Sequence, residues 1–580
     1  MNLLLYFMFL RIIDVKKSTR QYKYLKLVET AWNKGKVIQK TLLNFGNIEQ
    51  WPKEKLTEFI SKLTLFCNLP SAVETTETDV TIYQALDYGA PFILDALWKE
   101  LKLSECIRKH IAHNTCEIDI VPPVKAMVFN RLIEPSSKLK VFEWVKTQVI
   151  PEVYPQEIPL HHYYRSLDYL MAHKTSLEED VFWNVNDIFN IDLSLVFYDL
   201  TSSYFEGDSC DLATHGYSRD HRPDRRQIEI GLLVNRDGIP LAHEVWEGNV
   251  KDGKTVPDTL TTLQHRFNVK RCVFVGDNGM ATPENIRLLR ENHYEYIMSL
   301  KLLKDARALH LLQRFTPDDY TSFQKLKDNL LIREIPVPIT GFHTDERVII
   351  CYNPERAQTT KQRRDERLKE SQEYLQTIRD TSPKQGRRKK PEKIASMVER
   401  YLRKHGTYKY FTCAFTSGGA FEYQTRTDVL DQAAKTDGIW IILTNDQLLT
   451  SAEIAHGYKT LYEVEHAFRE IKNFLRIRPI YHSDDLRVRG HVFICVLAYL
   501  LEKILEKKLQ SAAVKLSPQK VLEYFKSIRM VTGEVMGKPI NKITEISKEQ
   551  KTILNSLGIA ETPKFPTFIQ ENQLKNQNIV

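Results

Sequence analysis

The sequence predicts an α/β fold built on a mixed sheet. Its central part contains short apolar runs with the length and composition of strands. The expected strands are 195–199, 227–235, 239–245, 272–275 and 294–300. Arg236-Asp-Gly238 is a strong hairpin signal between the second and third of them. Helices are expected at 256–267 and 283–292, so strands and helices alternate after the hairpins.

The order of these elements narrows the fold class. Three strands in hairpin order, then a helix and further strands, with carboxylates on the first and fourth strands, is the order of a ribonuclease-H-like core. An acidic helix should close such a core, but residues 306–445 intervene first. That interval contains strand-like runs at 330–336, 347–352, 409–415 and 439–444. We therefore expect a core in two parts, 191–305 and 446–510, interrupted by a β-rich insertion.

The regions outside the core are expected to be mainly helical. At the N-terminus, runs 22–29 and 36–44 predict a short β-hairpin and 51–68 a helix, which together form a domain over 1–70. A polar linker follows near 74–79. Helical periodicity then predicts a domain over 80–190, with segments at 91–101, 123–133 and 160–172. A helix-turn-helix is possible there, although its recognition helix cannot be placed. Residues 511–580 form a C-terminal tail.

Composition is that of a globular protein with several domains. The chain has 580 residues, of which 42% are hydrophobic and 27% charged, and this length predicts two to four domains. The net charge is only +8. Between 361 and 404, however, 15 Lys or Arg stand against 7 Asp or Glu, including Arg387, Arg388, Lys389 and Lys390. This segment is either a surface that follows a DNA backbone or a helical hairpin that needs charge for solubility.

Cysteine usage and apolar runs indicate a cytoplasmic protein. The eight cysteines contain no Cys-x-x-Cys pair and no His cluster at zinc spacing, so we expect a reduced compartment and no structural zinc. The apolar start, 1–13, lacks the features of a signal peptide and is too short to span a bilayer. It either extends a first strand or precedes a translation start at Met8. The run 492–501 predicts a buried helix, and no membrane partner is expected.

Two of the expected strands end in an aspartate. Asp199 ends the run 195–198, and Asp277 comes just after the run 272–275. A carboxylate next to a buried strand is costly unless something compensates it. Hard divalent cations prefer carboxylate oxygens, and a pair of them can activate an attacking oxygen and stabilise a leaving one. The alternative is that both residues only begin turns, where Asp is common.

A third acidic residue, Glu465, lies on an expected helix. Residues Tyr458, Leu461, Glu465 and Lys472 follow one another at steps that place them on one helix face, with Arg469 one turn after Glu465. A carboxylate that could bind metal, followed by cations that could bind phosphates, is typical of an active-site helix. A surface helix with a ladder of salt bridges would show the same spacing.

These motifs together resemble a known family. Tyr458, Glu465 and Lys472 match the Y-(2)-R-(3)-E-(6)-K signature of bacterial insertion-sequence DDE transposases, of the IS4-like superfamily and IS1634 type. Further stretches similar to that family are 197–204, 216–225, 248–249, 277–280, 437–438, 443–445 and 478–482. Two positions depart from the family pattern: Leu461 replaces the arginine of the signature, and Asn278 stands where arginine is frequent.

The resemblance implies a function. It implies cut-and-paste DNA transposition, in which Asp199, Asp277 and Glu465 hold two Mg²⁺ ions, with Mn²⁺ as a possible substitute. Tyr458, Arg469 and Lys472 would contact phosphates. The implied partners are double-stranded DNA, as terminal inverted repeats and target, and a second copy in a synaptic homodimer at the nucleoid. Alternatives are a nuclease without strand transfer and a catalytically inactive DNA-binding descendant.

One aromatic residue in the insertion has two interpretations. Trp440 could stack on an unpaired base, because base stacking on an exposed indole is favourable. It lies in a strand-like run, however, and such a position favours a role in the core.

Overall fold

The computed structural model shows two compact units. It describes residues 7–17, 20–33, 36–67, 80–111, 118–206, 210–250, 254–259, 266–267, 273–277, 279–302, 304–314, 319, 322–327, 329–336, 341–381, 391–417, 419–535, 538–559 and 563–565. One unit comprises residues 1–84 and 532–541, and the other comprises 85–531 and 542–580. Each is described by itself.

The smaller unit begins with an antiparallel meander. Its strands, in the order β1-β2-β3, are β1 (Phe7–Lys17), β2 (Arg20–Asn33) and β3 (Lys36–Asn47), and helix α1 (Lys53–Phe66) follows. Phe45, Trp51 and Phe59 form an edge-to-face aromatic cluster that ties the helix to β3. The expected hairpin and helix are confirmed, and the apolar start of the chain extends a first strand from Phe7 onward. Strands β4 (Val80–Asp87), β16 (Arg529–Val535) and β17 (Lys538–Ile543) form a separate sheet in the order β17-β16-β4.

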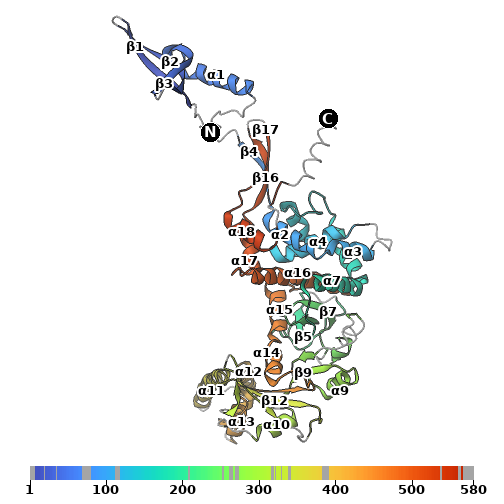
Figure 1. Ribbon diagram of the computed structural model, residues 1–580. Coiled ribbons are helices and arrows are strands. Elements are labelled where there is room, and N and C mark those ends of the chain that lie inside the picture. Colours follow the sequence, from blue (N-terminus) through green and yellow to red (C-terminus); the bar gives the residue numbers. More distant parts are fainter. Residues whose placement is uncertain are drawn as a thin grey trace. The chain divides into compact units, whose positions relative to one another are not determined.

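The larger unit is built on a nine-stranded sheet in the order β10-β11-β12-β15-β9-β8-β5-β6-β7 (Figure 1). Its strands are β5 (Leu195–Tyr204), β6 (Gln227–Asn235), β7 (Pro240–Glu247), β8 (Val273–Gly276), β9 (Glu295–Ser299), β10 (Gln324–Lys325), β11 (Leu331–Ile335), β12 (Arg347–Tyr352) and β15 (Ile439–Thr444). Strands β5, β8 and β9 run parallel, and all other neighbours are antiparallel. The five strands β7-β6-β5-β8-β9 therefore form the core sheet that the sequence predicts.

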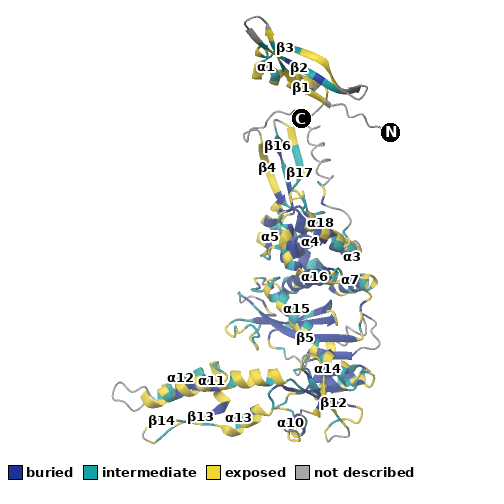
Figure 2. Cartoon of the chain, turned by 60° about the vertical axis from the view of Figure 1, so that its left-hand side comes forward, coloured by how far each residue is buried: buried dark blue, intermediate teal, exposed yellow. Residues whose placement is uncertain are grey.

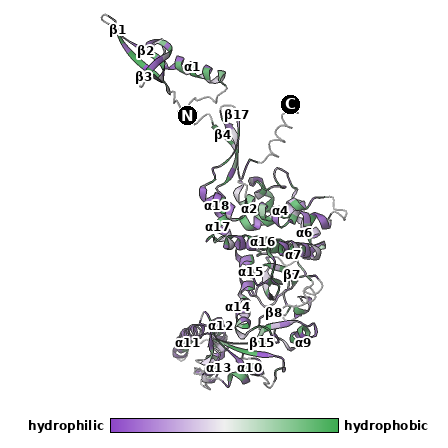
Figure 3. Ribbon diagram, viewed as in Figure 1, coloured by the Kyte–Doolittle hydropathy of each residue, from purple (hydrophilic) through white to green (hydrophobic). Residues whose placement is uncertain are grey.

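The insertion between the two halves of the core differs from the expected β-rich module. Strands β11, β12 and β15 join the core sheet beyond β9, because β15 is apolar on both faces and Ile441, Ile442 and Leu443 are fully buried. The separate part is mainly helical, with α11 (Pro354–Thr381), α12 (Pro391–Lys404) and α13 (Thr427–Ala434) around the hairpin β13 (Phe411–Phe415) and β14 (Phe421–Thr425). Figure 2 shows α11 and α12 largely exposed, and Figure 3 colours β15 mostly hydrophobic.

The larger unit contains one long buried helix, α16 (Asp485–Ser511). The others are α2 (Gly89–Glu100), α3 (Leu103–Ile111), α4 (Val121–Ile133), α5 (Lys138–Trp144), α6 (Leu160–Ala172), α7 (Lys174–Phe189), α9 (Pro283–Glu291), α10 (Ala306–Leu312), α14 (Ser451–Lys459), α15 (Tyr462–Asn473), α17 (Pro518–Phe525) and α18 (Lys548–Ser556). Helix α16 packs on α2, α4 and α6, and also on α15 and β7 (Figure 1). The run 492–501 is thus a buried helix, as expected. Within the described residues, no helix is long and apolar enough to cross a membrane.

Candidate active site

Strand register brings Asp199 and Asp277 together. Strand β5 pairs in parallel with β8, with Phe197 opposite Val275, and each aspartate lies two residues further along its strand direction. Side chains alternate between the faces of a sheet, so both carboxylates leave the same face. Neighbouring strands are about 4.8 Å apart, which makes these two acids direct neighbours across the sheet.

The turn after β8 holds Asp277 in place. One carboxylate oxygen, Oδ1, accepts hydrogen bonds from the backbone N–H of Gly279 at 2.7 Å and of Met280 at 3.2 Å. An aspartate commonly begins a turn in this way, so the structural interpretation of Asp277 is correct as far as it goes. Because the same residue also stands beside Asp199, the turn positions a carboxylate at the edge of the sheet.

The third acid lies on a helix that is shorter than expected. The continuous helix predicted from Tyr458 to Lys472 is wrong: α14 ends at Lys459, Thr460 and Leu461 form a turn, and α15 begins at Tyr462. Tyr458 therefore ends one helix, while Glu465 lies in the first turn of the next. Both helices meet the sheet, α14 at β8 and β9 and α15 at β5 and β6.

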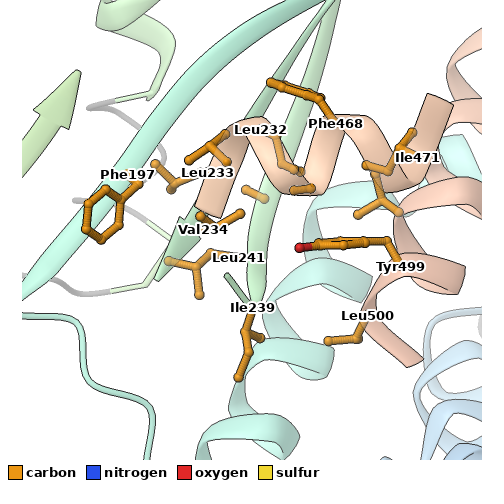
Figure 4. Packing of buried hydrophobic residues seen from close by; sticks show 14 of the residues in the cluster. Phe197, Leu232, Leu233, Val234, Ile239, Leu241, Phe468, Ile471, Tyr499 and Leu500 are labelled. Carbon is orange, nitrogen blue, oxygen red and sulfur yellow. The ribbon is translucent and has the colours of Figure 1, made fainter. Parts of the chain in front are cut away.

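Helix α15 is anchored by its apolar face. Figure 4 shows Phe468 and Ile471 of α15 beside Leu232 of β6 and Tyr499 of α16. Phe468 and Ile471 are almost fully buried, whereas Glu465, one turn before Phe468, is exposed. The amphipathic pattern of α15 thus keeps the carboxylate of Glu465 away from the core.

The three acids influence one another electrostatically. Burial, together with the negative charges of Asp277 and Glu465, raises the pKa of Asp199 to about 8, and the charge of the nearby Arg219 opposes this shift. Carboxylates that share a site cannot all ionise without compensation. The structure therefore places Asp199, Asp277 and Glu465 within one electrostatic neighbourhood, as the sequence predicted.

Tyr458 lies in the same neighbourhood. Burial, together with the charges of Asp277 and Glu465, raises the pKa of its phenol to about 12, and a hydrogen bond with Ser299 opposes this shift. Ser299 is the last residue of β9 and stands level with Asp277, since Gly276 pairs with Met298. Asp199, Asp277 and Ser299 therefore form a row across three parallel strands, at the ends of β8 and β9. The strand expected to end at Asp199 in fact continues to Tyr204, so Asp199 lies within β5.

This donor set suits a hard divalent cation. The site contains three carboxyl groups, and one of them, Asp199, is buried enough to hold a proton near neutral pH. The negative charge of this group of acids is what a divalent cation such as Mg²⁺ or Mn²⁺ would neutralise. Within the described residues, no three His, Cys, Asp or Glu side chains surround a common point closely enough to form a ready ligand shell. The acids are neighbours in the fold, and their side chains would have to converge on a bound ion.

The cations predicted to bind DNA have partners within the protein. Lys472 donates a hydrogen bond at 2.7 Å to the buried carboxylate of Asp220, and Arg478 donates to the same oxygen. Arg469 is exposed, and its guanidinium lies over the ring of Tyr462 and donates to the hydroxyl at 3.1 Å. Arg469 is thus accessible to a DNA strand, whereas Lys472 would first have to exchange its partner.

Two cavities adjoin the acids, and both are lined by Lys301. The sequence analysis did not identify this residue. A cavity of about 860 Å³ includes Tyr458 and Glu465 in its lining, and one of about 1150 Å³ includes Asp277. Lys301 lines both and is exposed. Lys301 lies two residues beyond Ser299, the end of β9. Its position just after a strand that ends beside the acids is the feature of the sequence that could have identified it.

Trp440 lines the first of these cavities. It is partly buried in β15, its Nε1 is buried without a hydrogen-bond partner, and the guanidinium of Arg356 lies 5.7 Å from its ring centroid. It therefore packs against the core and also faces the cavity beside Glu465.

Some predicted residues cannot be placed. Arg387, Arg388, Lys389 and Lys390, as well as Asn278, lie outside the described residues.

Comparisons with known proteins agree with this geometry. Residues 194–501, more than half of the chain, match the model of a transposase DDE domain, and residues 10–72 match that of the N-terminal domain of IS1634 family transposases. The chain is an IS1634-family DDE transposase. The resemblance seen in the sequence is confirmed, and no curated protein was found to match the chain.

Family membership explains the fold of the larger unit. A DDE transposase is a phosphoryl-transfer enzyme that acts on DNA with divalent metal, and its catalytic domain has a ribonuclease-H-like core. The matched region begins at the start of β5 and ends within α16, so it spans the core sheet, the insertion and the helix that carries Glu465.

Proposed function

We propose that this transposase cleaves DNA at the ends of its insertion sequence and joins them to target DNA, with Asp199, Asp277 and Glu465 as its metal ligands. The observation that carries the assignment is the equal register of Asp199 and Asp277 on parallel strands. The negative charge of Glu465 also raises the pKa of the Asp199 carboxyl group, which brings the third acid into the same site. When bound, a pair of Mg²⁺ ions activates the attacking oxygen and neutralises charge on the leaving oxygen.

The protein's own residues supply position and charge. Asp199 provides the buried carboxylate, which gives up its proton when a cation takes its place. The turn of Gly279 and Met280 orients Asp277, so that this carboxylate does not need to be ordered during the reaction. Glu465, on the exposed side of α15, can swing toward a bound cation at the cost of little packing.

Exposed and half-buried polar groups around the acids would hold the DNA strand. Arg469 and Lys301 are exposed beside Glu465 and Asp277, and Tyr458 presents a hydroxyl that stays protonated at neutral pH. Lys472 would exchange its bond with Asp220 for a phosphate. Such contacts orient the strand and carry no sequence information. Recognition of the terminal inverted repeats is assigned to the helical region 80–190, and synapsis of two ends to a homodimer at the nucleoid.

Cleavage of DNA that carries the element's terminal repeats tests the metal ligands. In Mg²⁺, the wild type should release the element end, and Asp199→Asn, Asp277→Asn and Glu465→Gln should each lose at least about a hundredfold in rate, since each removes a charge that stabilises the transition state. Glu463→Gln is the matched control, because Glu463 lies on the same helix near Lys503 of α16. A substituted acid that leaves the rate unchanged is not a metal ligand.

The same reaction distinguishes the alternatives. Release of ends followed by insertion into a target plasmid supports transposition. Release without insertion, under conditions that supply free 3′-hydroxyl ends, supports a nuclease. Binding of the repeats with no cleavage in Mg²⁺ or Mn²⁺ supports an inactive descendant.

A further inference from the structure

A second cluster of polar side chains lies away from the three acids, in the larger unit. A cavity of about 260 Å³ opens between α4, α5, α6 and the segment 476–482 that joins α15 to α16. The ionisable nitrogen-containing side chains that line it are those of Arg131, Lys138, Arg476, Arg478, His482 and His491. Among the described residues, no Asp or Glu contributes to the lining. A cavity with several cations and no carboxylate is unusual in a folded protein, because buried charges are normally paired.

Arg131 is the first buried cation without a counterion. It is 5% exposed, and its guanidinium donates to three backbone carbonyls, those of Leu475, Arg476 and Ser136. These carbonyls satisfy hydrogen bonds but carry no net charge. An arginine side chain stays protonated in proteins, so a full positive charge remains at the cavity wall.

Lys138 is the second basic side chain that is buried with no counterion among the described residues. It is 3% exposed, and its Nζ lies 2.5 Å from Nδ1 of His491. The other ring nitrogen of His491, Nε2, donates to the carbonyl of Ile477 at 2.9 Å, so Nδ1 is the acceptor and the ring is neutral. The ammonium therefore uses one N–H on His491, and within the described residues it has no other hydrogen-bond partner. Its remaining donors are available to a molecule in the cavity.

The opening of the cavity is also positive. Arg476 is exposed there, and Arg478 shares the carboxylate of Asp220 with Lys472 of α15. The positive field is strong enough to affect a neutral neighbour, since burial and the charges of Lys138 and Arg131 lower the pKa of His482 to about 3. The cavity and the active-site helix are thus linked through one ion-pair network.

We infer that this cavity binds a phosphate group, and that in the working enzyme the group is a backbone phosphate of DNA. Two buried basic groups without an anion are unfavourable as cations, and burial together with the charge of Arg131 accordingly lowers the pKa of Lys138. Phosphate oxygens would accept charge-assisted hydrogen bonds from both groups and would favour the charged form of Lys138. The cavity, at about 260 Å³, is large enough for a group of this size. The DNA source rests on the proposed function; a free phosphate ion has the same chemistry and is the alternative source.

Two variants remove cavity cations in different ways. Lys138→Met removes the buried ammonium and keeps the length of the side chain. Arg476→Asn removes the exposed cation at the opening and tolerates the left-handed backbone of that residue, whose φ is 47°. Lys551→Gln is the control, since Lys551 is exposed on α18 and its loss changes net charge equally.

The first arm uses inorganic phosphate as the probe. Phosphate, compared with chloride at equal ionic strength, should raise the melting temperature of the wild type and of Lys551→Gln. The rise should be absent in Lys138→Met and reduced in Arg476→Asn. An equal rise in the wild type and both cavity variants overturns the site. If Lys138→Met does not fold, Arg476→Asn decides the outcome.

The second arm uses a DNA duplex without the terminal repeats, and measures binding against salt concentration. Each cavity variant should lower the slope of log K against log salt by about 0.9, the value for one lost phosphate contact, and Lys551→Gln should not. An unchanged slope together with a lost phosphate effect overturns DNA as the source and leaves free phosphate. A wild type that binds no DNA contradicts the proposed function, while the phosphate arm still tests the cavity.

Discussion

Glu502, in the middle of α16, is a buried carboxyl group whose charge the fold does not fully compensate. It is 4% exposed, and burial together with the charges of Glu470 and Glu506 raises its pKa to about 9, an effect that Lys503 only partly offsets. At pH 7 the folded protein therefore keeps a proton on Glu502, whereas the unfolded chain, with the ordinary pKa of 4.5, does not. Because the native state binds more protons, the fold loses stability as pH rises from about 4.5 to about 9.

Glu502→Gln removes this dependence, because glutamine has the same shape and is neutral at every pH. From pH 4.5 to pH 7 the linkage covers about 2.5 pH units, or roughly 3 kcal/mol at 1.36 kcal/mol per unit. The amide oxygen can still accept the hydrogen bond that Gln519 donates. Burial of the extra amide N–H group reduces the gain by about 1 kcal/mol or more. We expect the variant to be about 1–2 kcal/mol more stable than the wild type at pH 7 and about 1 kcal/mol less stable near pH 4.5, because the cost of burying the amide is the same at both pH values.

Urea unfolding in a chelator at pH 4.5, 6 and 7.5 measures the effect. Glu506→Gln is the control, because Glu506 is partly exposed and pairs with Lys503 at 2.6 Å. Loss of that surface pair should change stability by less than about 1 kcal/mol. DNA cleavage should be retained in both variants. A stability difference that does not change with pH, or a Glu502→Gln variant less stable than the wild type at pH 7.5, would refute the reasoning.

Three further outcomes follow from the site and its supports. The apparent affinity for Mg²⁺, measured by protection against heat unfolding, should rise with pH up to about 8, because a cation must displace the proton of Asp199; a flat profile would contradict the raised pKa. Phe468→Ala should lower the unfolding free energy by about 3–5 kcal/mol and slow cleavage by moving Glu465, and Phe468→Leu should recover most of both in the same assays. Asp220→Asn should destabilise the fold by about 2–4 kcal/mol in urea unfolding, because it leaves the cation of Lys472 without a buried counterion; stability equal to the wild type would show that this pair is not needed.

The sequence alone predicted elements whose pattern is local. The strands of the core, the hairpin at Arg236-Asp-Gly238 and the buried run 492–501 were found because alternating or continuous apolar residues report burial directly. The helix from Tyr458 to Lys472 was predicted as continuous because the residues used for the prediction recur at helical spacing across Thr460 and Leu461. Both keep helical backbone angles, so nothing in their residue types marks the turn between α14 and α15.

The arrangement of the insertion needed long-range information. Strands β12 and β15 lie more than eighty residues apart, yet they pair with each other, and β15 also pairs with the distant β9. Pairing between distant strands is decided by which apolar faces can be covered at once, and a local pattern does not contain that choice.

By itself, the sequence determined the three acids, their family and the strands that two of them belong to or follow. Only the tertiary structure decided that Asp199 and Asp277 stand at equal register, that Lys472 is held by Asp220, that Lys301 adjoins the acids, and that Arg131 and Lys138 meet without a counterion. The physical reason is the same in each case. Residue type sets which charge or hydrogen bond a side chain can offer, whereas the packing of distant segments sets which partner receives it.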